Sequence, residues 1–326
     1  MVYLDTTYTN GVIAAKEKRL LKEKLFRLCE VSAEEGFRVL LDSGFGGGAE
    51  TASSVYEFEK LIEREEADLD AFIQEYAPSF AERAYLLAPR DFHNAKACVK
   101  AACLERDTEG MLSPEGLVSK ELILDCVKTG NFAPIKELNT YLGGACEEAT
   151  AILAEEKSGA KTGEIFEKAL YSYLYEVVKR KPALKKLLLA KADMTNILIA
   201  FRAGDSERAK EQYLPIGELK IEDLDKLFLT DTEKTMRAFR ETPYASFVQS
   251  CFSAKEKGLP YVEAEKMLAG YDVAYFAEHK YELKKNEPFL YYVYRRRGEN
   301  ANVRIVFVCL LAGLSEQDVK KRLRRW

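Results

Sequence analysis

Three short polar signatures recur along this 326-residue chain at nearly equal intervals. In each signature an acidic residue precedes an asparagine by one helical turn, and an apolar stretch and a basic residue follow. The signatures with their bases are Asp91–Asn94 with Lys96, Asp193–Asn196 with Arg202, and Glu299–Asn302 with Arg304. Because self-similarity at a fixed period marks a repeated structural unit, a spacing of about one hundred residues predicts one module used three times.

Helical periodicity dominates the rest of the chain. Leu21, Leu25 and Leu28 share one face of a helix, and charged residues fill the positions between them. The segment Phe289–Tyr294 could form a strand, but the arginine-rich stretch that follows favours a helix. With 47% hydrophobic and 31% charged residues, the composition is that of a folded globular protein. The sequence therefore predicts an all-α fold.

Matching turns extend the repeat beyond the signatures. Ser113-Pro114-Glu115-Gly116 and Leu214-Pro215-Ile216-Gly217 each precede a helical segment at the same place in the period. Glycines interrupt the pattern near residues 109 and 210, and neither junction is a flexible Ser/Gly or Pro linker. We expect three helical modules that pack together, with approximate bounds 1–108, 109–209 and 210–326.

A short break also recurs about fifty to sixty residues before each signature asparagine. The breaks span residues 42–45, 139–142 and 241–244, and each contains a serine or threonine. Hydroxyl side chains at such positions cap a new helix or close a turn with the backbone. We therefore expect each break to separate two helices of a module.

The signatures are best explained as structural joints between modules. An acid and an asparagine one turn apart lie on the same side of a helix, and buried polar groups of this kind need hydrogen-bond partners. Equivalent helices of the three modules could supply those partners around a shared axis. The predicted joint residues are Asp91, Asn94, Asp193, Asn196, Arg202, Glu299, Asn302 and Arg304.

Catalysis by Asp91 or Asp193 is the alternative, but no common set of partner residues accompanies either carboxylate. The chain has two histidines, His93 and His279. His93 takes a position that a threonine and an alanine fill in the other two signatures, so it is not part of the common pattern. We expect no catalytic residue.

The glycine-rich segment Gly44–Ala49 contains the outline of a dinucleotide-binding fingerprint. No series of β-α units follows it, and a related loop at Thr140–Ala145 occupies the same place in the second module. A loop that connects helices in two modules needs no phosphate. We therefore expect no bound cofactor, although nucleotide binding stays open as an alternative.

Charge is unevenly distributed along the chain. Residues 281–326 carry eleven basic and five acidic residues, whereas the whole chain has a net charge of −4. Arg295, Arg296 and Arg297 could form a docking surface for an acidic protein partner. Nucleic acid is the alternative partner, but no nucleic-acid-binding module surrounds these arginines, so we do not expect it.

Seven cysteines are scattered without a Cys-x-x-Cys pair or zinc-like spacing. They are expected to be buried free thiols, which indicates a reducing, cytoplasmic compartment and no metal site. The longest apolar run, Ile305–Leu314, is about half of a membrane span. No direct membrane span is predicted.

Taken in order, these motifs give a family resemblance over essentially the full length. The chain resembles the C-type subunit of the bacterial and archaeal V/A-type rotary ATPases, the counterpart of the vacuolar ATPase d subunit. Individual motifs are short, and their order and spacing carry the resemblance. The matching elements are Tyr8, Ala14–Leu21, the three signatures with Lys96, Ile197, Arg202, Arg304 and Ile305, the turn Leu214-Pro215-x-Gly217, and Gly313-Leu314-Ser315. Arg90 and Lys16 depart from the family pattern.

This resemblance implies a funnel-shaped protein of three similar helical modules. It also implies a non-catalytic rotor adapter that links the central axle subunits to the proteolipid ring on the cytoplasmic face of the membrane. Such an adapter transmits torque between ATP hydrolysis or synthesis and the transport of H⁺ or Na⁺. The alternative is a generic helical-repeat scaffold outside any ATPase, which fits the repeats but leaves the full-length order of motifs unexplained.

Overall fold

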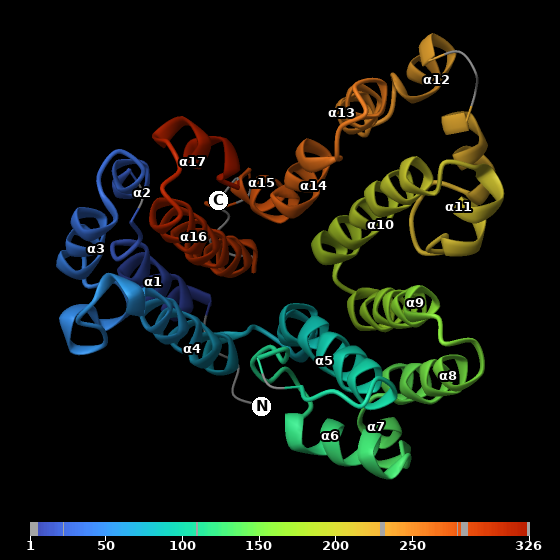
Figure 1. Cartoon of the computed structure of the whole chain (residues 1–326), viewed down its shortest axis with the longest axis horizontal. Coiled ribbons are helices and arrows are strands. Elements are labelled where there is room, and N and C mark those ends of the chain that lie inside the picture. Colours follow the sequence, from blue (N-terminus) through green and yellow to red (C-terminus); the bar gives the residue numbers. More distant parts are fainter. Residues whose placement is uncertain are drawn as a thin grey trace. The chain divides into compact units, whose positions relative to one another are not determined.

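The computed structural model describes residues 6–21, 23–108, 110–228, 232–278, 280–281 and 286–324. Within these residues the chain is helical and contains no strand, so the predicted all-α fold is confirmed. The chain divides into two compact units, whose helices are labelled in Figure 1. Unit 1 consists of Met1–Pro78 and Val262–Trp326, and unit 2 is Ser79–Tyr261. The segment Phe289–Tyr294 lies in a helix, as predicted.

Unit 1 is built around one long helix, α16, which contacts α1, α2, α3, α4, α15 and α17. Its helices are α1 Thr6–Glu17, α2 Lys24–Leu28, α3 Ala33–Asp42, η1 Phe45–Glu50, η2 Val55–Glu57, α4 Phe58–Tyr76, α14 Val262–Ala269, α15 Tyr271–Ala277, α16 Glu287–Leu311 and α17 Glu316–Arg322. The predicted apolar face of Leu21, Leu25 and Leu28 packs in this core with Phe37, Phe58 and Phe307. Burial of such side chains is the main stabilising term of a fold. The two ends of the chain therefore share one core.

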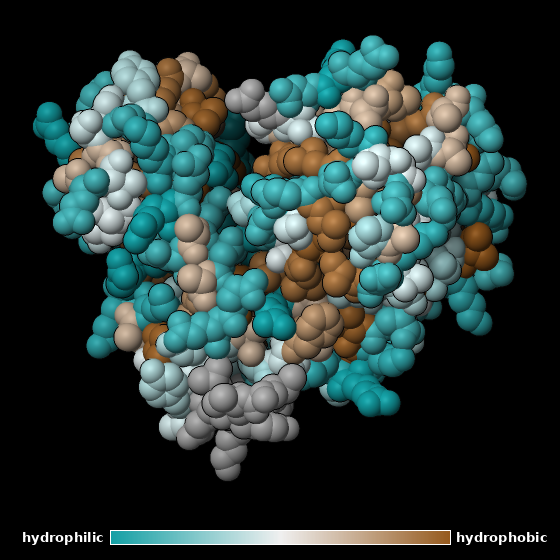
Figure 2. All heavy atoms as spheres, turned by 90° about the horizontal axis from the view of Figure 1, so that it is seen from below, coloured by the Kyte–Doolittle hydropathy of each residue, from teal (hydrophilic) through white to brown (hydrophobic). Residues whose placement is uncertain are grey.

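Unit 2 holds the remaining helices. They are α5 Phe80–Cys103, α6 Lys120–Thr129, α7 Ala133–Leu138, α8 Thr140–Glu156, α9 Gly159–Val178, α10 Pro182–Ala203, α11 Ser206–Gln212, η3 Ile221–Phe228, α12 Thr232–Phe239 and α13 Ala245–Glu256. One core cluster joins α5, α6, α7, α8 and α9. Apolar side chains gather in patches on the otherwise mostly hydrophilic surface in Figure 2. Exposed large apolar side chains of this unit include Leu124 and Leu138.

Two of the three predicted breaks contain the same hydroxyl-centred turn. Ser43 Oγ donates to the carbonyl of Leu40 at 2.6 Å and accepts from the amide of Phe45 at 3.4 Å. Thr242 Oγ1 likewise donates to the carbonyl two residues before the break and accepts from the amide of Tyr244. Both hydroxyls therefore form a hydrogen-bonded turn at the end of a helix.

The middle break has a different structure. The prediction of a loop at Thr140–Ala145 is wrong, because these residues lie in a helix. Asn139 accepts a hydrogen bond from the Leu142 amide at 3.1 Å and caps α8, which begins at Thr140. An asparagine cap satisfies one of the free amides of the first turn. Gly143 and Gly144 consequently lie inside a helix, unlike the glycines of η1.

The division into two units follows different boundaries from the three expected modules. The module bounds 1–108, 109–209 and 210–326 therefore stay a prediction about the repeat.

Candidate functional site

The first two signature asparagines make the same pair of hydrogen bonds. Asn94 lies on α5, where its Nδ2 donates to the carbonyl of Ser113 at 3.2 Å and its Oδ1 accepts from the Ser113 amide at 2.8 Å. Asn196 lies on α10 and holds both backbone groups of Leu214 at 3.0 and 2.8 Å. Each asparagine thus binds the first residue of the Pro-x-Gly turn that follows its helix.

The third asparagine repeats this geometry near the end of the described chain. Asn302 Nδ2 donates to the carbonyl of Arg324 at 3.0 Å, and its Oδ1 accepts from the Arg324 amide at 2.8 Å. Like Asn94 and Asn196, Asn302 is fully buried. We refer to these three paired interactions as the asparagine clamps. A primary amide is suited to this role because it offers a donor and an acceptor side by side.

The carboxylate of the first signature binds the other end of the same turn. Asp91 accepts hydrogen bonds from the amides of Leu117 at 2.9 Å and Val118 at 3.2 Å. A Cβ atom built on Gly116 would lie closer than 3.0 Å to the Asp91 carboxylate. Only glycine therefore lets this turn approach Asp91 so closely.

The second signature has the same arrangement with one addition. Asp193 accepts from the amides of Glu218 at 3.0 Å and Leu219 at 2.9 Å, and Gly217 makes the close approach. The hydroxyl of Tyr244 also donates to Asp193, at 2.7 Å. One turn of helix α10 therefore fixes both a Pro-x-Gly turn and the start of α13.

Burial dominates the electrostatics of both aspartates. It raises the pKa of Asp91 to about 6, although the amides of Leu117 and Val118 act in the opposite direction. Burial also raises the pKa of Asp193, against the hydrogen bonds from Tyr244 and Leu219. In both carboxylates, burial disfavours the charged form more strongly than the hydrogen bonds favour it.

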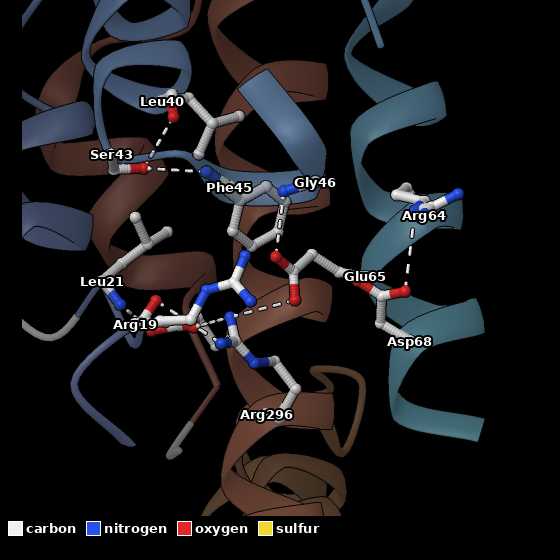
Figure 3. Close-up of polar contacts among 11 residues, drawn as sticks. Arg19, Leu21, Leu40, Ser43, Phe45, Gly46, Arg64, Glu65, Asp68 and Arg296 are labelled. Atoms are coloured by element: carbon white, nitrogen blue, oxygen red, sulfur yellow. Dashed lines mark hydrogen bonds and ion pairs between the residues drawn. The ribbon is translucent and has the colours of Figure 1, made fainter. Parts of the chain in front are cut away.

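The acid of the third signature binds a segment far away in sequence. Glu299 accepts from the Leu21 amide at 2.6 Å and from Arg296 at 2.7 Å. Figure 3 shows this cluster, in which Arg296 lies between the N-terminal segment and α4. Arg296 also donates to the carbonyl of Arg19 at 3.4 Å. The N-terminal segment therefore takes the place that a following turn has in the first two signatures.

The same cluster accounts for the glycine-rich segment. Glu65 lies 3.5 Å from Arg296 and accepts a hydrogen bond from the Gly46 amide at 2.9 Å. Gly46 has φ +58°, and a Cβ atom there would collide with the backbone of Leu61. This glycine permits close packing of η1 on α4, and its amide binds a carboxylate of the protein itself.

The signature bases have separate environments. Arg304 pairs with Glu59 at 3.0 Å and Glu66 at 3.4 Å, which links α16 to α4. These ion pairs join the basic C-terminal region to two acidic side chains of α4. Arg202, in contrast, is exposed on α10.

The three consecutive arginines differ in exposure. Arg296 is only 3% exposed and is held by Glu299 and Glu65, so its guanidinium does not face a partner. Arg295 and Arg297 are half-buried, and Arg295 donates to the Tyr291 hydroxyl at 3.2 Å. Internal carboxylates therefore compensate the buried charge of Arg296, and the docking surface expected for this run stays a prediction.

Sequence reasoning did not assign a role to Gly116, Gly217 or Tyr244. The shared spacing of the two Pro-x-Gly turns was the available signal for the glycines. His93 interacts with the carbonyl of Met111 at 3.1 Å, and His279 lies outside the described residues. Among the residues that the structure describes, no cluster of His, Cys, Asp and Glu is arranged to hold a metal ion.

Six of the seven cysteines are buried free thiols, as expected, and Cys103 is exposed. Burial raises the pKa of Cys146 to about 12 and that of Cys29 to about 11. Such thiols remain protonated and unreactive at neutral pH.

Comparison with protein families matches residues 9–322 to the model for the ATP synthase (C/AC39) subunit. The chain belongs to this family. The match covers all three signature asparagines and agrees with the resemblance that the motif order indicates. A comparison with curated proteins found no match. In the described part of the chain, no helix is both long enough and apolar enough to cross a membrane.

Proposed function

We propose that the chain is a non-catalytic rotor adapter of a V/A-type ATPase. In this role it links the central axle subunits to the proteolipid ring on the cytoplasmic face of the membrane. It transmits torque between ATP hydrolysis or synthesis and H⁺ or Na⁺ transport. Membership of the ATP synthase (C/AC39) subunit family supports the assignment to such a complex.

The observation that carries the mechanical part of this proposal is the repeated asparagine clamp. An element that transmits torque must be stiff, and close-packed interiors with satisfied polar groups resist deformation. In the first two signatures the clamp and its aspartate join the last helix of one expected module to the first turn of the next. We therefore interpret Asp91, Asn94, Asp193 and Asn196 as inter-module joints.

Arg304 and Glu299 support the same interpretation in unit 1, since they tie α16 to α4 and to the N-terminal segment. Arg202 is exposed on α10, and its role in a joint stays a prediction. A generic helical scaffold would use the same joints, so binding to ATPase partners distinguishes the two functions.

The direct experiment is a binding assay with purified partners. The chain should bind a detergent-solubilised proteolipid ring and, separately, the axle subunits of the same ATPase. Serum albumin on the same support serves as the unrelated control. Failure to bind both the ring and the axle would leave the generic scaffold as the better description.

A further inference from the structure

Unit 1 contains an open groove between α14, α16 and the C-terminal α17 segment, with a volume of about 690 Å³. We propose that this groove binds an acidic amphipathic helix of a partner protein. The groove supports this proposal independently of the adapter role. It combines an apolar floor, a basic wall and a fixed wall position.

The floor of the groove is apolar and accessible. Ile305 and Val308 of α16 and Val262 of α14 line it. Val308 is 53% exposed and Val262 is 46% exposed. Val308 lies on α16, the central helix of unit 1, and lines the groove. Contiguous exposed apolar side chains of this kind mark interaction sites.

The wall formed by α17 and the residues after it is basic. Lys321, Arg322 and Arg324 line the groove, and all three are exposed. Lys321 lies 3.5 Å from Asp318, whereas Arg322 donates to the backbone carbonyl of Asp318. Among the described residues, this wall therefore presents three cations beside the carboxylate of Asp318.

The third asparagine clamp fixes the position of this wall. Asn302 holds the backbone of Arg324 through two hydrogen bonds, which anchors the segment after α17 alongside α16. On the opposite side, Lys266 of α14 donates to the carbonyl of Lys321 and pairs with Glu263 at 2.9 Å. The position of the basic wall is thus fixed by contacts with both α16 and α14.

Its chemistry fits an amphipathic helix with carboxylates beside its apolar face. Such a helix inserts apolar side chains every three to four residues into a groove, and carboxylates at its edge would meet Arg322 and Arg324. Glu265 is the acidic residue among the lining side chains, and Lys266 and Arg304 lie beside it on the same lining.

Fluorescence anisotropy with two synthetic helical peptides tests this proposal on the full chain. Both peptides carry the same leucine and alanine face, and the polar face contains glutamate in one and lysine in the other. We expect only the glutamate peptide to bind. Its affinity should fall when ionic strength is raised to about 1 M, where the Debye length is about 3 Å.

The variant Arg322→Glu/Arg324→Glu should weaken binding of the glutamate peptide by about tenfold or more. Val308→Asp should weaken it as well, because it places a charge on the apolar floor. Arg27→Glu is the control, since Arg27 is exposed on α2 outside the groove. Circular dichroism melting of each variant establishes that the chain remains folded.

Three results with the peptides would overturn the proposal. The first is no binding of the glutamate peptide, and the second is equal binding of both peptides. The third is unchanged affinity in the double variant. Vesicles with about one third anionic lipid provide a further arm. If they bind the chain more tightly than the glutamate peptide does and lose affinity in the same variants, the groove recognises a membrane and the proposal is wrong.

Discussion

The side chain of Asn196 pairs with the backbone of Leu214 much as one peptide group pairs with another. Asn196 Nδ2 donates to the Leu214 carbonyl at 3.0 Å, and Asn196 Oδ1 accepts from the Leu214 amide at 2.8 Å. Both residues are buried, so water cannot replace either bond. The position of the turn after α10 is therefore specified by one side chain.

Replacement Asn196→Ala should lower the free energy of unfolding by roughly 1–3 kcal/mol, because it leaves the Leu214 amide and carbonyl buried without partners. Urea unfolding followed by circular dichroism measures this change. Gln249→Ala is the matched control, since Gln249 is exposed on α13, and it should change stability by less than about 0.5 kcal/mol. Equal effects of the two substitutions would show that the clamp is dispensable.

The close approach of Gly217 to Asp193 makes a second prediction. Gly217→Ala forces the turn away from the carboxylate and should cost roughly 1–3 kcal/mol. Gly163 lies inside α9 with open space around it, so Gly163→Ala should instead stabilise the chain by about 0.5–1 kcal/mol. Thermal unfolding of both variants gives the comparison. A neutral Gly217→Ala would contradict the proposed contact.

Asp91 predicts a particular pH dependence of stability. Its folded-state pKa of about 6 lies above the ordinary value of 3.8, because burial disfavours the charged form. The folded state therefore holds this proton more tightly than the unfolded state does. The contribution of Asp91 to stability is greatest below about pH 4, falls as pH rises to about 6, and is constant above about pH 7.

Unfolding free energies of the wild type and Asp91→Asn between pH 4 and 8 test this behaviour. The wild type should lose roughly 2–4 kcal/mol relative to the variant as pH rises through this window. The variant also loses one hydrogen-bond acceptor. This loss changes its stability by the same amount at every pH, so it does not affect the comparison of the pH dependence. If the wild type instead became more stable relative to the variant as pH rises, the hydrogen bonds from the backbone amides would outweigh burial in setting the pKa of Asp91.

Arg296 predicts a large loss of stability when its charge is removed. Arg296→Met leaves the buried carboxylates of Glu65 and Glu299 without their shared cation and should cost about 3–5 kcal/mol. Arg64→Met is the control, because the Arg64–Asp68 pair is exposed and should contribute about 0–1 kcal/mol. Urea unfolding at neutral pH measures both. If both substitutions cost a similar, small amount of stability, the Arg296 cluster would contribute no more than a surface ion pair.

The helical fold and the importance of the signatures could be predicted because both depend on local pattern. Leucines at helical spacing identify buried faces, and an acid and an asparagine one turn apart share one side of a helix. The matched spacing of the two Pro-x-Gly turns was also visible. What pattern alone did not reveal is that Asn94 and Asp91 hold the two ends of one such turn.

The remaining features depend on tertiary contacts. The partner of Glu299 is the Leu21 amide near the other end of the chain, and no local rule links these positions. The burial of Arg296 between Arg295 and Arg297 likewise follows from packing against α4 and the N-terminal segment. The glycines at residues 143 and 144 were misassigned to a loop because the Asn139 cap outweighs their low helix propensity.

We propose that this member of the ATP synthase (C/AC39) family links rotation to transport without catalysing a reaction itself. The most direct measurement compares ATP hydrolysis and ATP-driven ion uptake in vesicles containing the ATPase with and without the chain. The account predicts that hydrolysis persists without the chain, that ion uptake is lost, and that adding the purified chain restores uptake. Undiminished ion uptake without the chain, or hydrolysis that requires it, would contradict the account.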